Sequence, residues 1–256
     1  DWLLAQHPES QGRLKKYHQW LPNILNDHHE MGTSSTYFFQ PGVKSRNNPL
    51  IPEATYTLSQ KIAKYHAQSL DEIGSLYFSQ ERFDDFYFGK GSTYPDLHGC
   101  VGILFEQASS RGHVQENQFG ELTFPFTIRN QFQTSIGSLK AAKYLRVELL
   151  QHQREFFKTA IEEKSKVKGY VFGERFDRSR LVQFIKVLNF HQIKINKLKK
   201  ATMLSGKSFA PEHSFVVKMD QPQRRLIKTI FETQTSFKDS IFYDISTWSM
   251  PLSFNL

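Results

Sequence analysis

Apolar residues recur every three to four positions in five stretches of the chain, which is the spacing of one face of an α-helix. The first stretch has Pro8 in its first turn, where the missing N–H of proline leaves no helix hydrogen bond unmade. The longest contains Gly137, and we expect the helix to break there or beyond it. The pattern predicts helices over residues 8–22, 53–70, 124–163, 178–191 and 221–232.

Shorter apolar runs, bounded by turn-forming residues, predict strands. Residues 31–52 are rich in Gly, Ser, Asn and Pro and predict a long loop, and a second loop is expected to end near residue 120. The predicted strands cover residues 23–27, 75–79, 100–109, 169–173, 193–198 and 214–219.

The composition changes at KSKVKG, residues 164–169, and short strands and helices alternate after it. We therefore place a domain boundary near residue 165, with one domain over residues 1–165 and a second over residues 166–256. The expected fold class is α/β, with a mixed sheet flanked by helices followed by a smaller α/β domain.

The formal net charge of +8 raises the question of nucleic-acid binding. Lys and Arg concentrate after residue 140, where acidic and apolar residues separate them, and we find no stripe of arginine and aromatic residues of the kind that single-strand binders use. We therefore expect no nucleic-acid partner. No apolar run approaches the eighteen or so residues of a membrane span, so no span is expected.

Residues 24–32, ILNDHHEMG, place two histidines and two carboxylates at the end of an apolar run. Adjacent side chains in a strand point to opposite faces, so at most one of His28 and His29 can face a given site. Ligands of open α/β sheets bind at strand ends, where an imidazole is a good zinc ligand and a nearby carboxylate can orient it. The alternative is a polar strand end whose histidine only completes local hydrogen bonds.

Glu106 follows an apolar run of four to five residues. Burial at such a position raises the pKa of a carboxyl toward the range of a general base. The alternative is a glutamate that marks the exit of the strand to solvent.

Two glycines flank Lys90 in FYFGKGSTYPD, residues 86–96. Their spacing is not that of a phosphate-binding loop, and no helix start follows them. We interpret the segment as a mobile glycine-rich loop that presents a tyrosine hydroxyl, from Tyr87 or Tyr94.

In this order, the motifs resemble the second half of the catalytic domain of zinc carboxypeptidases, the carboxypeptidase A/B-like metallopeptidases. In that family a Pro-Glu-Ser or Pro-Glu-Thr helix precedes a strand ending in Asp-x-His, and residues 8–10 and 27–29 match. The family then has a loop tyrosine, a Gly-Ser pair and a strand ending in glutamate, as in residues 87–106. The resemblance covers about residues 1–150 and implies part of the family's mixed sheet.

The resemblance implies a zinc-dependent metallocarboxypeptidase that hydrolyses peptide or protein substrates and is secreted or periplasmic. His29 would be a zinc ligand, and Glu106 the general base that takes a proton from water. Tyr87 would bind the end of the peptide, and Glu30 and Thr93 would lie near the substrate.

In the family two further zinc ligands come from an H-x-x-E motif upstream of the matched region. We expect this chain to be a fragment without them, inactive by itself. HVQE, residues 113–116, has the ligand spacing but follows Glu106 in a predicted loop. Residues 166–256 vaguely resemble glutamine-amidotransferase-like modules appended to some bacterial relatives. The alternative function is a non-catalytic peptide-binding module that retains the peptidase fold.

Overall fold

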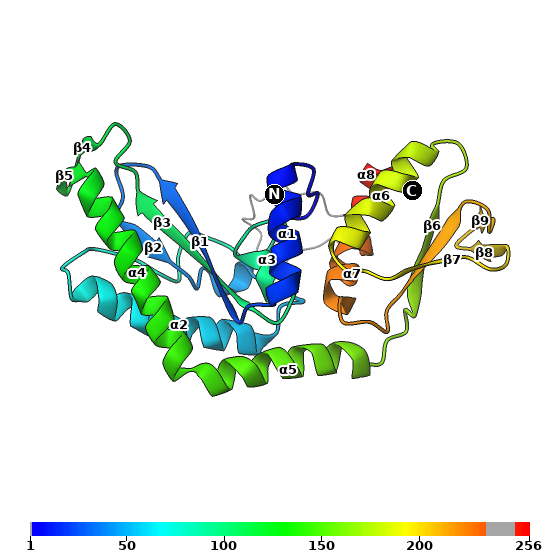
Figure 1. The fold of residues 1–256 in the computed structure, drawn as a ribbon, viewed down its shortest axis with the longest axis horizontal. Helices are drawn as coiled ribbons and strands as arrows, with labels where there is room; N and C mark the ends of the chain where they lie inside the picture. Colours follow the sequence, from blue (N-terminus) through cyan, green and yellow to red (C-terminus); the bar gives the residue numbers. More distant parts are fainter. Residues whose placement is uncertain (1, 234–248) are drawn as a thin grey trace. The chain divides into compact units, whose positions relative to one another are not determined.

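The computed structural model describes residues 2–233 and 249–256 of the chain. The fold is mixed α/β, with small sheets flanked by helices (Figure 1), which agrees with the expected class at that level. Contacts divide the chain into two compact units, residues 22–154 and residues 1–21 together with 155–256. The divisions fall after residues 21 and 154, and the N-terminal helix groups with the C-terminal residues, whereas the sequence suggested a single boundary near residue 165. Residues 234–248 of the expected second domain lie outside the described part.

The unit of residues 22–154 is built on a three-stranded sheet in the order β1-β3-β2. Strand β1 (Ile24–Met31) runs parallel to β3 (Val101–Ala108), and β2 (Tyr37–Phe39) is antiparallel to β3. The strands predicted at residues 23–27 and 100–109 are therefore confirmed. Strand β2 lies in the segment predicted as loop, and residues 75–79 form only an isolated bridge, through Phe78.

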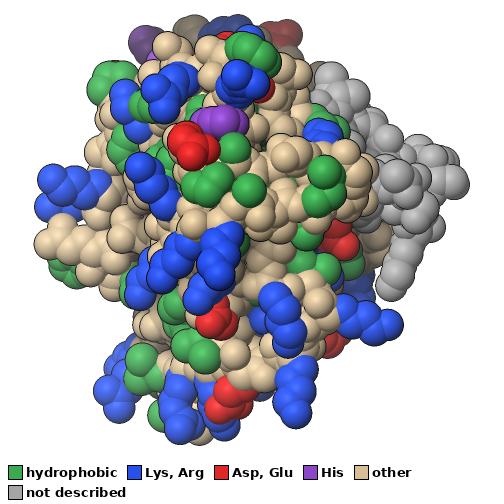
Figure 2. All heavy atoms as spheres, turned by 90° about the vertical axis from the view of Figure 1, so that its right-hand side faces the viewer, with side chains coloured by type: hydrophobic (Ala, Val, Ile, Leu, Met, Phe, Trp, Pro, Cys, Tyr) green, Lys and Arg blue, Asp and Glu red, His purple; other side chains and the backbone are tan. Residues whose placement is uncertain are grey.

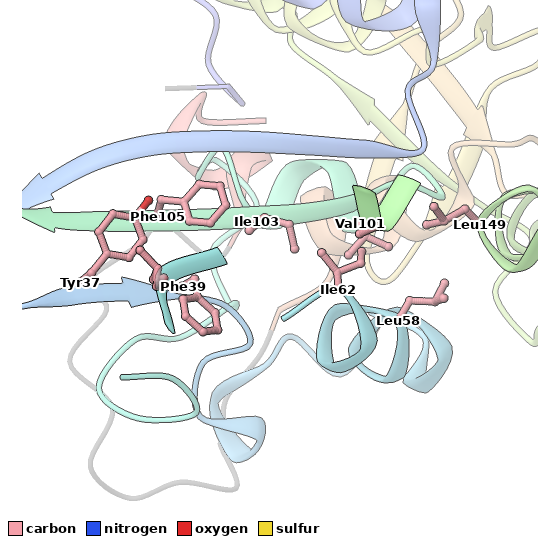
Figure 3. Close-up of a cluster of buried hydrophobic side chains, with 10 residues drawn as sticks. Tyr37, Phe39, Leu58, Ile62, Val101, Ile103, Phe105 and Leu149 are labelled. Atoms are coloured by element: carbon pink, nitrogen blue, oxygen red, sulfur yellow. The ribbon is translucent and has the colours of Figure 1, made fainter. Parts of the chain in front are cut away.

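One face of this sheet, which we call the helix face, packs against α2 (Glu53–Asp71) and α4 (Phe124–Tyr144). Side chains of β3, β2 and α2 meet there in an apolar core, which also includes Leu149 of α5 (Arg146–Glu162) (Figure 3). The predicted break of the long helix falls at Leu145, beyond Gly137. A Cβ at Gly137 would lie 3.1 Å from the carbonyl oxygen of Tyr65, so this glycine lets α4 approach α2 closely.

The opposite face, which we call the loop face, is covered by residues 84–97, a segment that includes the short helix α3 (Thr93–Asp96). A Cβ at Gly102 of β3 would lie 1.8 Å from the backbone oxygen of Ser92, so only glycine allows this approach. A 3-10 turn, η1 (Lys44–Arg46), precedes α2. The hairpin of β4 (Val114–Asn117) and β5 (Gly120–Thr123) lies in the second predicted loop.

The other unit contains α1 (Pro8–Trp20) and an antiparallel sheet in the order β6-β10-β7. Its core is aromatic: Phe172 of β6 packs edge-on against Phe184 of α6, with ring centroids 5.1 Å apart. A separate hairpin, β8–β9, was not predicted. The remaining bounds are β6 Gly169–Gly173, α6 Arg178–Phe190, β7 Ile195–Lys197, β8 Thr202–Leu204, β9 Lys207–Phe209, β10 Ser214–Lys218, α7 Arg224–Phe231 and α8 Met250–Ser253.

The predicted helices 8–22, 53–70, 178–191 and 221–232 are confirmed, with ends shifted by at most three residues. Among the described residues, no helix combines the length and the apolar character needed to cross a membrane.

Candidate functional site

The register between β1 and β3 brings residues that are distant in sequence to one face of the sheet. His29 pairs with Glu106, and Asp27 pairs with Leu104 two positions earlier. Since side chains in a strand alternate between faces, Asp27, His29 and Glu106 all lie on the loop face. His28 lies on the helix face, where its ring stacks on Phe105 with centroids 4.9 Å apart. The prediction that the two histidines point to opposite faces is confirmed.

His29 is held by the carboxylate two residues before it. Its Nε2 lies 3.1 Å from Asp27 Oδ2, and the two side chains are 52% and 26% exposed. A Cβ on Gly91 would lie 2.2 Å from that same Oδ2, so the glycine-rich loop passes directly over the Asp27 carboxylate. Only glycine leaves room for the Asp27 carboxylate at position 91. The loop backbone therefore limits where this carboxylate, and with it the ring of His29, can move.

Glu106 lies between a polar and an apolar neighbour on the loop face. His29 of β1 flanks it on one side, and Phe38 of β2, which is fully buried, flanks it on the other. Burial raises the pKa of the Glu106 carboxyl; His29 lowers it by a smaller effect, and Asp27 raises it. A half-buried carboxyl with a raised pKa is a stronger base than an ordinary solvent-exposed glutamate, as a general base requires.

A buried carboxyl, Asp85, ties the loop to the sheet. It accepts hydrogen bonds from Gln40 Nε2 at 2.7 Å, from Thr93 Oγ1 at 2.7 Å and from Ser92 Oγ at 3.2 Å. Gln40 in turn accepts a hydrogen bond from the backbone N–H of Leu104 at 2.9 Å. Burial raises the pKa of Asp85 to about 6, although its three donors favour the charged form.

Two further carboxyls hold the same segment. Asp96 accepts a hydrogen bond from the backbone N–H of Gly102 at 2.8 Å, and burial raises its pKa. Asp84 binds Lys90 Nζ through both oxygens, at 2.8 and 2.9 Å. The lysine of the glycine-rich loop is thus engaged within the loop. The expectation that no helix start follows these glycines is wrong, because α3 begins at Thr93.

The residues expected near the substrate are not all at the same place. Tyr87 is half-buried, whereas Tyr94, the other tyrosine considered for this role, is fully buried. Thr93 is fully buried and donates to Asp85, so it offers no surface to a substrate. Glu30 is exposed but lies on the helix-face side of β1, where it accepts a hydrogen bond from Ser109 Oγ at 2.8 Å.

Within the described part of the chain, no group of three or more His, Cys, Asp and Glu side chains is arranged to hold a metal ion. His113, considered above as a ligand with Glu116, lies beside the β4–β5 hairpin and contacts Phe124 instead. His29 still has the features of a single zinc ligand, because Asp27 engages Nε2 and no described residue bonds Nδ1. The described residues thus supply a single histidine, and not a complete set of metal ligands, at this strand end.

No protein-family model, curated protein or solved structure matches this chain. The case for a function therefore rests on the geometry of the loop face and on the motif order of the sequence.

Sequence reasoning missed the carboxyls that fix the loop. The pair Asp84–Asp85 directly precedes the glycine-rich segment, and two acidic residues before an aromatic run were the available signal. Their separate roles depend on Gln40 and Lys90, which the local pattern does not reveal.

Proposed function

We propose that this chain is the C-terminal part of the catalytic domain of a zinc metallocarboxypeptidase. The observation that carries the proposal is the direct pairing of His29 with Glu106 at the carboxyl ends of two adjacent parallel strands. That end of a parallel sheet is where α/β enzymes place their ligands. A histidine oriented by a carboxylate, next to a glutamate of raised pKa, is the minimum that a zinc hydrolase needs at this edge.

Each residue has a stated role in this proposal. His29 Nε2 lies 3.1 Å from Asp27 Oδ2, so Nδ1 would be the nitrogen that binds a metal ion. When bound, zinc would supply a Lewis acid for the scissile carbonyl and a lower pKa for the attacking water. Glu106 would take the proton of that water and pass it to the leaving amine. Tyr87 would bind the end of the peptide, while Thr93 and Glu30 have other partners.

The open edge of the sheet indicates where the other ligands would enter. Among the described residues β1 pairs with β3 alone, so one edge of its eight residues has no strand beside it. A long exposed edge strand is a template for pairing with further polypeptide. Under this proposal, a strand added beside β1 would place its own side chains next to His29.

The test uses the product of the complete gene, with metal content and hydrolysis of C-terminally free peptides as readouts. Glu106→Gln should keep its zinc and lose turnover by about 10²–10⁴-fold, the usual effect of removing a general base. His29→Ala should lower the zinc content, and its neighbour His28→Ala is the matched control that should not.

Unimpaired turnover in Glu106→Gln would refute the role of that residue. Zinc loss in His28→Ala but not in His29→Ala would refute the site. Peptide binding without hydrolysis, and without dependence on zinc, would favour the non-catalytic peptide-binding module.

A further inference from the structure

The positive charge of the chain is concentrated in one stretch of the unit formed by residues 1–21 and 155–256. Residues 178–211 contain eight Lys and Arg residues and no Asp or Glu. This excess equals the net charge of the whole chain, +8. The expectation that acidic residues separate the basic ones therefore fails here. A stretch of this kind is an electrostatic site for an anionic partner.

The charge is carried by the β8–β9 hairpin and the segment before it. Lys197, Lys199, Lys200 and Lys207 are exposed, and none forms an ion pair with any residue that the structure describes. We call residues 197–209 the basic hairpin. Figure 2 shows the side of the molecule that lies on the right in Figure 1, where β8 and β9 are labelled. This face carries many Lys and Arg side chains and few acidic ones.

The tip of the basic hairpin is apolar on both of its faces. Met203 pairs with Ser208, and Leu204 pairs with Lys207. Ser205 and Gly206 close the turn with positive φ values of 48° and 77°, as in the two-residue hairpin turn with two left-handed positions. Met203 is 67% exposed and Leu204 is 43% exposed. Neighbouring residues point to opposite faces, so a core on one side of the ribbon could cover at most one of these two side chains.

We propose that the basic hairpin docks onto an anionic lipid surface. The lysines would contact the phosphate-containing headgroups, and Met203 and Leu204 would enter the boundary with the acyl chains. This combination of cationic flanks and apolar tip is the arrangement by which peripheral proteins bind anionic bilayers.

A lipid surface fits better than nucleic acid for a specific reason. Single-stranded nucleic acids are bound by stacking bases on exposed aromatic rings. The one aromatic residue of the basic hairpin, Phe209, is half-buried, and the exposed side chains at the tip are aliphatic. Exposed aliphatic side chains gain free energy when they leave water for hydrocarbon.

The test is flotation of the 256-residue chain with vesicles of phosphatidylcholine alone or with 30% phosphatidylglycerol, in low and physiological salt. We expect binding to the anionic vesicles alone, weakened by salt. Lys199→Gln, Lys200→Gln and Lys207→Gln together should reduce it on the order of a hundredfold. The matched control changes three exposed lysines of other elements, Lys15, Lys16 and Lys64, to Gln and should lose far less.

The apolar tip is tested separately. Met203→Ser with Leu204→Ser should weaken vesicle binding about tenfold without changing its salt dependence. Ile128→Ser with Leu139→Ser, at sites 52% and 66% exposed on α4, is the matched control. Circular dichroism verifies that each variant is folded.

Three results with vesicles would each overturn the proposal, and a fourth comes from DNA. The three are equal binding to neutral and anionic vesicles, no vesicle binding at all, and vesicle binding that survives the lysine substitutions. Tighter binding to single-stranded DNA than to anionic vesicles, lost in the same lysine variant, would overturn it in favour of nucleic acid.

Discussion

The helix face and the loop face of the sheet use alternate residues of the same strands but are stabilised in different ways. On the helix face Phe105 packs with Tyr37, Ile62 and other buried apolar side chains. On the loop face, Asp85 and Asp96 hold the covering segment through hydrogen bonds. An apolar contact tolerates small shifts because it is not directional, whereas a hydrogen-bond network fixes a segment in one position. The face with the fixed loop is the one that carries His29 and Glu106.

The two faces should respond to pH in opposite directions, and the larger response belongs to the helix face. Burial lowers the pKa of His66 of α2 from 6.5 to about 3, with a smaller effect of His28 in the same direction. The unfolded chain protonates His66 near pH 6.5, so its contribution is complete above that pH and is lost as the pH falls toward 3. Between pH 6.5 and pH 3 this loss amounts to on the order of 5 kcal/mol of the free energy of unfolding.

Urea unfolding of His66→Gln between pH 4 and 7 tests this. The variant should lose that part of the pH dependence, while His29→Gln, at an exposed site of the loop face, should keep it. Parallel pH profiles for wild type and His66→Gln would contradict the assignment.

The loop face should show the reverse dependence through Asp85. Its folded pKa of about 6 lies above the ordinary value of 3.8, chiefly because of burial. Its contribution to stability is therefore complete below pH 3.8 and is lost as the pH rises to about 6, on the order of 3 kcal/mol. In Asp85→Asn the destabilisation relative to wild type should shrink as the pH rises through this window, as measured by urea unfolding. Asp71→Asn, at the exposed end of α2, should show no such trend.

The smallest effect concerns the adjacent histidines themselves. His28 donates from Nδ1 to Gln131 Oε1 at 2.7 Å and stacks on Phe105, so His28→Ala should cost about 1–2 kcal/mol. His29 has only the exposed pair with Asp27, so His29→Ala should cost less than about 1 kcal/mol. Thermal unfolding of the two variants shows which histidine, that of the helix face or that of the loop face, contributes more to stability. A larger loss for His29→Ala would mean that the loop face, not the helix face, depends on its histidine for stability.

The sequence predicts the long elements well because their periodicity is local. The run at residues 100–109 identifies β3, and alternation correctly separates His28 from His29. Strand β2 could not be found in this way, since Tyr37–Phe39 has only three residues and pairs with a partner distant in sequence. The β8–β9 hairpin was missed because each of its strands has only three residues and mixes apolar with polar ones, so no continuous apolar run marks it.

The candidate site was predictable only in part. Motif order selected His29 and Glu106, and the register places them side by side. The burial of Thr93 could not be read from its neighbours, because it follows from the position of Asp85. Whether a polar residue binds a substrate or a buried carboxyl depends on the folded loop.

The side-chain amide of Gln40 can take only one orientation between the sheet and the loop. Its Oε1 accepts a hydrogen bond from the backbone N–H of Leu104, and its Nε2 donates one to Asp85. If the amide were rotated by 180°, its NH₂ group would face the N–H of Leu104 and its oxygen would face the carboxylate of Asp85, so both hydrogen bonds would be lost. An asparagine at position 85 that kept its oxygen toward Thr93 would meet Gln40 donor against donor. Positions 40 and 85 are therefore expected to vary as a pair: an amide at 85 becomes compatible when a carboxylate stands at 40. In that exchange the negative charge moves from the loop to the residue that follows β2.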